Sequence, residues 1–189
     1  TLFGGARGGG KTDGVLGEWI THAEQYGSEA IGLCIRRERT QLLEMIERSK
    51  TLFRPLGAVF LEIDKMWRFP NGARLRFAYL ESDSDAQSYQ GHSYTRVYVE
   101  EMGTFPNPDP IFKLFATLDR NPKVPSRFIA TANPGGPGHS WIKKRYIDPA
   151  PAGLELIPTV YENPLTNEKI IKNRIFIPSK VGDNIYTNT

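Results

Sequence analysis

The chain has 189 residues, of which 39% are hydrophobic and 24% are charged, and its formal net charge is +3. This composition excludes a disordered or fibrous chain and predicts a globular domain with a buried core. No apolar run approaches the ~20 residues that cross a bilayer, so no membrane partner is expected. The single cysteine, Cys34, excludes an internal disulfide and indicates a reducing compartment.

Strands and helices alternate along the first half of the chain. Residues 1–3 look like the end of a strand that leads into a glycine-rich loop. Apolar residues then recur at helical spacing from Val15 to Ala23, and Gly27 is suited to end this helix. Residues 30–35 form an apolar strand. Thr40 is placed to cap a second helix, whose apolar side carries Leu42, Leu43 and Ile46.

Turn signals divide the rest of the chain. Residues 66–69 and 73–80 flank Pro70-Asn71-Gly72, which predicts a hairpin. Its second arm alternates, with Leu75, Phe77 and Tyr79 on one face and Arg74 and Arg76 on the other. Further strands are expected at 97–99, 127–131, 154–161 and 170–177, and further helices around 111–118 and 140–146, the latter capped by Ser140. This order predicts an α/β fold with a mainly parallel sheet flanked by helices and with antiparallel edge strands.

The glycine-rich loop matches the phosphate-loop pattern G-x-x-x-x-G-K-[ST] at every fixed position, as Gly5-Ala6-Arg7-Gly8-Gly9-Gly10-Lys11-Thr12. Its glycines let backbone N–H groups curl around a phosphate, and the following helix points its positive end at the anion. Lys11 would neutralise the β- and γ-phosphates of ATP, and the Thr12 hydroxyl would bind Mg²⁺. Arg7, inside the loop, would reach the γ-phosphate.

Two adjacent carboxylates follow the apolar strand 97–99. A phosphate loop requires a carboxylate for the Mg²⁺ shell and a group that orients the attacking water. Glu100 is the candidate for the metal and Glu101 for the water. Aspartate is the usual residue at the first position, so Glu100 binds Mg²⁺ either directly or through water.

A third strand ends in Thr131, Ala132 and Asn133, and a glycine-rich segment, 134–139, follows it. Small polar residues at a strand end beside the phosphate site are suited to sense the γ-phosphate and relay its loss.

Basic residues gather in two stretches that contain no acidic residue. One is Lys65, Arg68, Arg74 and Arg76, and the other runs from Arg120 to Arg145 with Lys123, Arg127, Lys143 and Lys144. Such clusters suit DNA phosphates, and a solvated basic face is the alternative for both. For Arg74 and Arg76, arginine stems packed over the sheet are a further alternative.

Together, these motifs resemble the ATPase domain of the large terminase subunits of tailed bacteriophages, which package viral DNA. The resemblance rests on the arginine-bearing phosphate loop, the segment 67–73, Tyr89-Gln90-Gly91 before the acidic strand, and the stretch 131–139 with Trp141.

The resemblance implies a P-loop NTPase fold of the additional-strand, conserved-glutamate type, and ATP hydrolysis that drives double-stranded DNA into a procapsid. It assigns Lys11 and Thr12 to phosphate and metal, Arg7 to the loop arginine, Glu101 to catalysis, and residues 131–133 to coupling. It also implies a portal protein and a small terminase subunit as partners, a ring on the procapsid, and the host cytoplasm as location. The isolated domain is expected to be monomeric.

The resemblance further implies that residues 1–189 are an ATPase fragment, without the start of its first strand and without a C-terminal nuclease domain. In a ring, an arginine from a neighbouring subunit would complete the ATP site, and Arg96, Arg120 and Arg127 are the candidates. Two alternatives stay open: another P-loop motor such as a RecA-type helicase, and a non-catalytic docking module gated by nucleotide.

Overall fold

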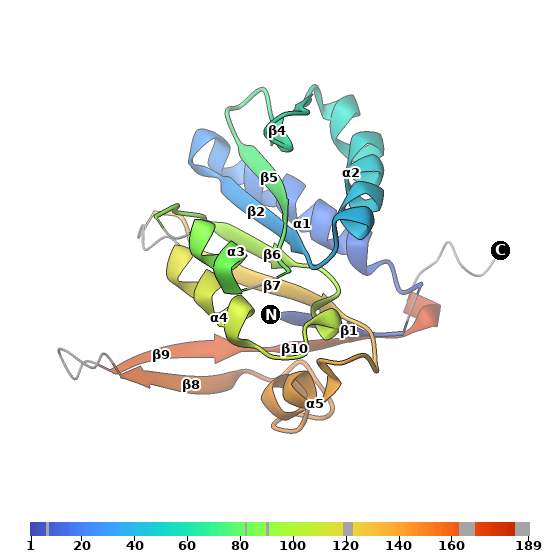
Figure 1. Cartoon of the computed structure of the whole chain (residues 1–189), viewed down its shortest axis with the longest axis vertical. Helices are drawn as coiled ribbons and strands as arrows, with labels where there is room; N and C mark the ends of the chain where they lie inside the picture. Colours follow the sequence, from blue (N-terminus) through green and yellow to red (C-terminus); the bar gives the residue numbers. More distant parts are fainter. Residues whose placement is uncertain (7, 82, 90, 119–122, 163–168, 184–189) are drawn as a thin grey trace.

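The computed structural model describes residues 1–6, 8–81, 83–89, 91–118, 123–162 and 169–183. An eight-stranded sheet lies between two layers of helices (Figure 1). The strand order is β10-β1-β7-β6-β2-β5-β4-β3, parallel from β10 to β5 and antiparallel from β5 to β3. The strands of this sheet are β1 (Leu2–Gly5), β2 (Ile31–Arg36), β3 (Val59–Leu61), β4 (Met66–Arg68), β5 (Arg74–Tyr79), β6 (Arg96–Val99), β7 (Arg127–Ala132) and β10 (Phe176–Ser179).

This order confirms the predicted fold class. β7 lies between β1, which leads into the phosphate loop, and β6, which carries the two glutamates, so it is the additional strand of the fold. The carboxyl ends of the parallel strands meet at one edge of the sheet, where open α/β folds bind their ligands.

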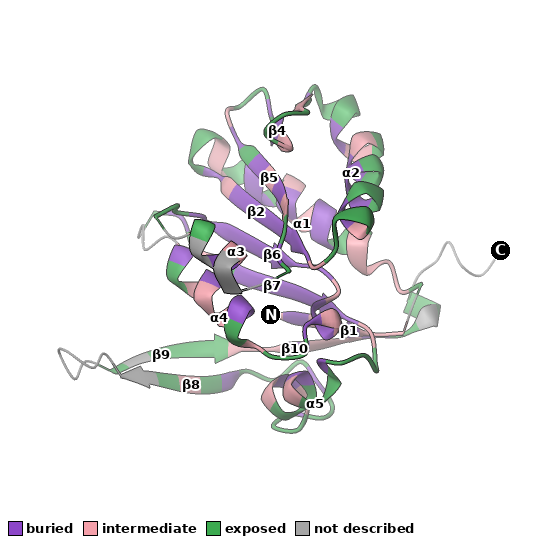
Figure 2. Cartoon of the chain, in the orientation of Figure 1, coloured by how far each residue is buried: buried purple, intermediate pink, exposed green. Residues whose placement is uncertain are grey.

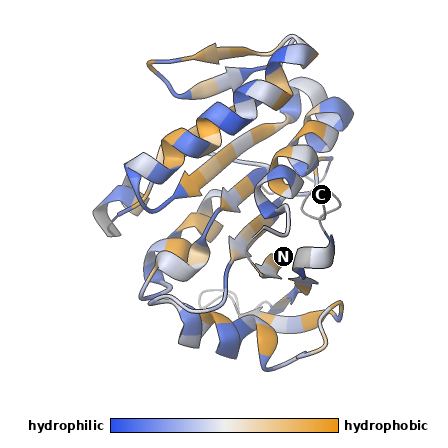
Figure 3. Cartoon of the chain, turned by 90° about the vertical axis from the view of Figure 1, so that its right-hand side faces the viewer, coloured by the Kyte–Doolittle hydropathy of each residue, from blue (hydrophilic) through white to orange (hydrophobic). Residues whose placement is uncertain are grey.

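Each face of the sheet has its own apolar core. On one face lie α1 (Lys11–Tyr26) and α2 (Arg39–Phe53), which pack around the fully buried Trp19 and Trp67. On the other lie α3 (Asp83–Ser88), α4 (Asp109–Leu114) and α5 (His139–Ile142), which contact β6 and β7. Figure 2 shows the buried central strands between these layers, and Figure 3 shows hydrophilic and hydrophobic residues alternating along the helices.

The hairpin that the sequence analysis linked to the terminase family is a structural anchor. Trp67 donates its indole N–H to Ser49 Oγ at 2.8 Å and packs edge-on against Phe53, 5.4 Å between ring centroids. Asn71 donates its side-chain amide to the Ala23 carbonyl at 2.7 Å, which ties the turn to the end of α1. The hairpin therefore fixes both helices of one layer.

Two helices begin earlier than the sequence-based expectations. α2 begins at Arg39 after Glu38, so Thr40 lies inside the helix and is not its cap. Ser140 lies inside α5, which begins after Gly138 and continues as a π-helical turn (Lys143–Ile147). The π turn accommodates one residue more than an α-helical turn.

Two side chains expected on apolar faces are exposed. Leu43 points to solvent, because its neighbour Leu42 takes the position that faces the sheet. Tyr79 was expected to share the buried face of Leu75 and Phe77, but it ends β5 at the rim of the sheet and is exposed there.

The last part of the chain forms three strands where two were predicted. β8 (Ile157–Glu162) and β9 (Lys169–Arg174) form a separate antiparallel ribbon. The chain then leaves the ribbon at Ile175, whose carbonyl accepts a hydrogen bond from the Leu2 N–H, and continues as β10 beside β1. The single strand predicted over 170–177 joined the apolar residues on both sides of the polar residues Lys172–Arg174, and the ribbon ends at these polar residues. The expected turn at 163–167 lies outside the described residues.

His22, on α1, is buried beside the sheet. Its Nε2 is hydrogen-bonded to Thr95 Oγ1 at 2.8 Å, and its Nδ1 is buried without a hydrogen-bond partner among the described residues. Burial is the main cause that lowers the pKa of His22 to about 4, with the nearby Arg96 as the next cause.

We expect His22 to make stability depend on pH between about 6.5 and 4. The unfolded chain binds a proton at His22 in this range and the folded chain does not, so the free energy of unfolding falls as the pH falls. Thermal unfolding of His22→Gln should show a shallower dependence over this range than the wild type. His92→Gln, a change at an exposed histidine, is the matched control and should follow the wild type. Identical pH slopes for all three proteins would contradict the assignment.

Candidate functional site: a phosphate loop facing two glutamates

The phosphate loop runs from the end of β1 into α1, as predicted. A Cβ atom on Gly5 would lie 2.0 Å from the Ser179 carbonyl oxygen, and one on Gly9 would lie 2.1 Å from Ser179 Oγ. Gly5 must therefore be glycine, because its Cβ would meet the backbone of β10, whereas a Cβ on Gly9 would only require the Ser179 side chain to rotate. The Ala6 N–H donates to the Ser179 carbonyl at 3.0 Å. Ser179 is thus a support of the loop that the sequence analysis missed.

The loop ends in a helix whose first turn is open to an anion. Gly10 precedes α1 in a left-handed conformation (φ 69°), and no side chain caps the helix. The first N–H groups of α1 thus keep their capacity to bind an anion. Lys11 curls back on the loop, with its ammonium hydrogen-bonded to the Ala6 carbonyl and 3.4 Å from that of Gly5. Burial lowers the pKa of Lys11, and the carboxylates of Glu100 and Glu101 act in the opposite direction.

The predicted metal pair comes together. The Thr12 hydroxyl, at the start of α1, donates a hydrogen bond to Glu100 Oε1, at the end of β6. Glu100 is buried, with a side chain only 2% exposed. The two residues, 88 positions apart in the chain, thus present neighbouring oxygen atoms below the loop. Oxygen atoms of this kind are the ligands that Mg²⁺ prefers.

A third residue, Arg36, completes the cluster and was not predicted. It ends β2, the strand next to β6, and its Nε donates to Glu100 Oε2 at 2.6 Å. Its Nη1 lies 3.6 Å from Glu101 Oε2. One guanidinium therefore faces two adjacent carboxylates. The only sequence signal for it was an arginine at the carboxyl end of a buried strand, the edge where the other site residues lie.

Glu101 sits at a bend directly after Glu100. Its backbone is left-handed (φ 53°), which is uncommon for a residue with a side chain and marks local strain. Its side chain is 35% exposed, so it reaches solvent where Glu100 does not. The Thr104 N–H and hydroxyl both donate to the Glu101 carbonyl at 2.9 Å, which holds the bend.

The predicted coupling strand contacts this bend. Thr131 Oγ1 accepts a hydrogen bond from the Glu101 N–H at 3.0 Å. Ala132 is buried at the end of β7, and the Oδ1 of the next residue, Asn133, is buried with no hydrogen-bond partner among the described residues. Of the three predicted coupling residues, Thr131 has the direct contact with the catalytic candidate.

The glycine segment after Asn133 packs against the loop that follows Glu101. The Gly138 N–H donates to the Gly103 carbonyl at 2.9 Å, and the Trp141 indole donates to the Phe105 carbonyl at 2.9 Å. A Cβ atom on Gly138 would lie 2.4 Å from the Phe105 oxygen, which requires glycine there. The segment thus joins β7 to the loop behind Glu101.

Two of the candidate trans-acting arginines can be placed. Arg96 is buried at the start of β6, where it donates to Glu18 Oε1 at 2.9 Å. This ion pair stays within the chain, so Arg96 does not present its guanidinium to a neighbouring subunit, and the expectation for it is corrected. Arg127 is exposed at the start of β7. Arg120 lies outside the described residues, as does Arg7 of the phosphate loop.

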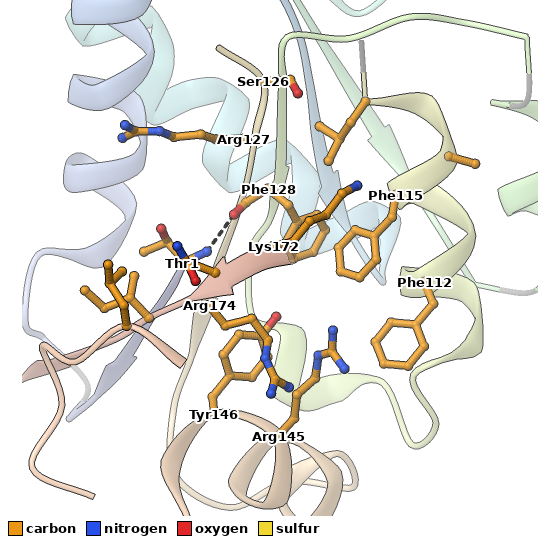
Figure 4. Close-up of a pocket in the computed structure, with 15 residues that line it drawn as sticks. Thr1, Phe112, Phe115, Ser126, Arg127, Phe128, Arg145, Tyr146, Lys172 and Arg174 are labelled. Carbon is orange, nitrogen blue, oxygen red and sulfur yellow. Dashed lines mark hydrogen bonds between the residues drawn. The ribbon is translucent and has the colours of Figure 1, made fainter. Parts of the chain in front are cut away.

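A hollow of about 860 Å³ lies at the opposite edge of the sheet, near the start of β1 and β7. Its lining combines aromatic and basic side chains, including Phe112, Phe115 and Arg145 (Figure 4). The Arg145 guanidinium lies over the Phe112 ring, 4.6 Å from its centroid. None of the described residues of the phosphate loop lines this hollow, so it is separate from the candidate nucleotide site. Among the described residues, no helix is long and apolar enough to cross a membrane.

Comparison with known proteins agrees with this geometry. The sequence model of the family "Terminase large subunit, T4likevirus-type, N-terminal" matches residues 2–140, more than half of the chain. No curated protein matches the chain.

Several solved structures share the fold. The large terminase of a thermophilic bacteriophage superposes with a TM-score of 0.70 at 17% identity, over 97% of this chain and 41% of that one. The complex of that terminase with ADP gives 0.69 at 16% identity, over 98% and 41%. The N-terminal domain of the DNA packaging ATPase from bacteriophage phi29 gives 0.51 at 17% identity, over 69% and 71%.

At these identities the superpositions establish the fold, and the chain spans about two-fifths of the length of the first of these terminases. Family membership rests on the match over residues 2–140: the chain belongs to the phage terminase large subunits and corresponds to their N-terminal domain.

Proposed function

We propose that this domain binds and hydrolyses Mg²⁺-ATP at the phosphate loop, and that hydrolysis drives double-stranded viral DNA into a procapsid in the host cytoplasm. The observation that carries the proposal is the Thr12–Glu100 contact with Glu101 beside it, because it joins the phosphate loop to the acidic strand. The solved terminase with bound ADP supports a nucleotide as ligand. Family membership favours the packaging motor over the helicase alternative.

Phosphate binding falls to the loop and to Lys11. In this role the Lys11 ammonium leaves the Gly5 and Ala6 carbonyls and moves to the β- and γ-phosphates, where it meets a stronger acceptor. The open first turn of α1 contributes N–H donors and the positive end of the helix dipole. Arg7 remains the proposed γ-phosphate contact from within the loop.

The metal is proposed at Thr12 and Glu100. Their oxygen atoms fit Mg²⁺, and no group of three or more His, Cys, Asp or Glu side chains among the described residues could enclose a metal. A site with so few protein ligands suits Mg²⁺, which usually keeps several waters and binds substrate phosphates. When bound, Mg²⁺ neutralises charge that develops on the phosphate oxygens.

Catalysis is proposed for Glu101, which would orient the attacking water and accept its proton. Its carboxylate is partly exposed at the site's edge, and Thr131 and Thr104 hold its backbone. Arg36 is a positioning residue, because its guanidinium lies between the carboxylates of Glu100 and Glu101. It reduces the repulsion between them and limits where the Glu101 side chain can point.

The assembled motor would add partners. We propose a ring on the procapsid in which an arginine of the neighbouring subunit completes each ATP site, with Arg127 and Arg120 as remaining candidates. Such an arginine is worth ~10³-fold or more in rate, so the isolated domain should hydrolyse ATP slowly. Double-stranded DNA, a portal protein and a small terminase subunit complete the proposed set of partners.

The first test separates catalysis from nucleotide binding. Glu101→Gln should bind a fluorescent ATP analogue as the wild type does, yet release phosphate about 10² to 10⁴-fold more slowly, because the water loses its base. Lys11→Ala should lose affinity for the nucleotide. Glu44→Gln, an exposed change of the same chemistry on α2, is the control and should retain both properties. Unchanged phosphate release in Glu101→Gln would favour the alternative, a docking module gated by nucleotide.

The second test concerns Arg36. Arg36→Ala leaves the buried Glu100 carboxylate without its cationic partner, so the free energy of unfolding should fall by about 3 kcal/mol. The turnover number should fall by about 10²-fold as Glu101 loses its position, with a smaller change in KM for ATP.

Arg36→Lys should recover part of the turnover, because it restores the charge without the forked geometry. Arg39→Ala removes an exposed arginine at the start of α2 and is the matched control. If Arg36→Ala lost stability but kept the turnover number of the wild type, Arg36 would have only a structural role, and its proposed positioning of Glu101 would be wrong.

A further inference from the structure

Three arginines share one face of the β4–β5 hairpin. The antiparallel register places Arg68 directly opposite Arg74, and Met66 directly opposite Arg76. Directly opposite residues project to the same side of a sheet, with Cβ atoms about 4.5–5.5 Å apart. Arg68, Arg74 and Arg76 therefore form one positively charged surface, which we call the arginine face.

The arginine face has no counter-charge among the described residues. Their ion pairs occupy other basic side chains, namely Arg36, Arg48, Lys50, Arg96 and Lys143. No carboxylate in the described part of the chain pairs with Arg68, Arg74 or Arg76. Like charges directly opposite each other destabilise an antiparallel pair. The arrangement therefore favours an anion from outside the chain.

This side of the hairpin is also open. The other side carries Trp67, Leu75 and Phe77, which are buried under α1 and α2. In Figure 1, α3 and α4 lie over the middle of the sheet and do not extend over β4 and β5. A hollow of about 240 Å³, lined by Arg74, Arg76 and His92 among others, opens beside the arginines.

Protection of a sheet edge does not explain these charges. Charged residues commonly blunt an exposed edge strand against aggregation. Here the edge strand is β3, whereas the arginines lie on β4 and β5, the second and third strands from the edge.

The other basic stretch is differently arranged. Lys143 pairs with Asp148, and the Arg145 guanidinium lies over the Phe112 ring. Both charges thus have partners inside the chain, unlike those of the arginine face. Arg127 and Lys144 of the same stretch are exposed, but they lie on different elements, at the start of β7 and in the π-helical turn, whereas the three arginines share one face of a hairpin.

We infer that the arginine face is the surface of this domain that contacts the phosphates of double-stranded DNA. The inference rests on the proposed function for the identity of the polyanion and names the contact surface. Guanidinium groups bind phosphate oxygens in a forked geometry, and no acidic side chain of the described residues competes for them here. Contacts of this kind read the backbone and not the bases, which suits a motor that moves DNA of any sequence.

The test is the salt dependence of DNA binding by the 189-residue chain without nucleotide. Each phosphate contact contributes about −0.9 to the slope of log affinity against log salt, so Arg68→Gln/Arg74→Gln should reduce the slope by about 1.8. If the two binding lines meet near ~1 M salt, the variant binds roughly 60-fold more weakly at ~0.1 M. The loss should be equal for two duplexes of unrelated sequence. The melting temperature should be unchanged or higher, because the opposed charges are gone.

The control is Lys143→Gln/Lys144→Gln, which removes the same charge from the other basic stretch and should retain most of the affinity and slope. The inference would be overturned if Arg68→Gln/Arg74→Gln kept the salt slope and the DNA affinity of the wild type. It would also be overturned if the control lost as much affinity as this variant, or if the wild type did not bind duplex DNA. Glu101-dependent ATP turnover is measured separately, so these outcomes leave the proposed hydrolysis standing. If ATP turnover proved independent of Glu101, that result would count against the proposed hydrolysis and not against DNA binding by the arginine face.

Discussion

The contact between Thr12 and Glu100 holds the candidate site together, and Arg36 extends it to a third element. The three residues come from the start of α1 and the ends of β6 and β2, so a single buried cluster joins the phosphate loop to two strands of the sheet. A buried carboxylate requires such partners, because its charge is otherwise poorly solvated. The sheet places the loop near the two glutamates through β7, and the cluster links the side chains of the loop and of β6 directly.

The segment 131–141, which is one of those on which the family resemblance rests, contacts the loop that carries Glu101. Thr131 binds the backbone of Glu101, and Gly138 and Trp141 bind the carbonyls of Gly103 and Phe105 in the following loop. A shift of either segment must therefore move the other. The strained backbone at Glu101 lies beside these contacts, so a displacement of either segment would change the direction of its carboxylate.

The two sides of the hairpin that follows α2 serve different purposes. Trp67, on one side of the hairpin, is hydrogen-bonded to α2. Asn71, in the turn, is hydrogen-bonded to α1. The opposite side carries the arginine face, and among the described residues no helix covers it and no carboxylate pairs with it. β5 is also hydrogen-bonded to β2 along its length, and β2 ends in Arg36. The proposed DNA surface and the proposed ATP site therefore lie on neighbouring strands of one sheet.

The sequence by itself determined the elements that depend on local chemistry. The phosphate loop and its helix follow from glycine spacing and apolar periodicity, and the alternation of apolar strands and helices predicted the parallel α/β class. Glu100, Glu101 and Thr131 were predicted as site residues because polar residues at the end of apolar strands collect at one edge of a parallel sheet. The family resemblance came from short motifs in a fixed order along the chain, such as the phosphate loop and the segments 67–73 and 131–139.

Only the tertiary structure decided which distant residues meet. Arg36 carries only the weak signal of an arginine at the end of a buried strand, and Ser179 carries none, since their roles exist only where β2 lies beside β6 and β10 beside β1. Arg96 looked like an available cation until the fold buried it against Glu18. The break at Ile175 and the exposure of Leu43 likewise follow from which neighbour occupies the space beside the sheet. The charge and hydrophobicity of a residue can be read from the sequence, but its burial and its partners depend on its position in the fold. Burial and partners determine what the residue can do.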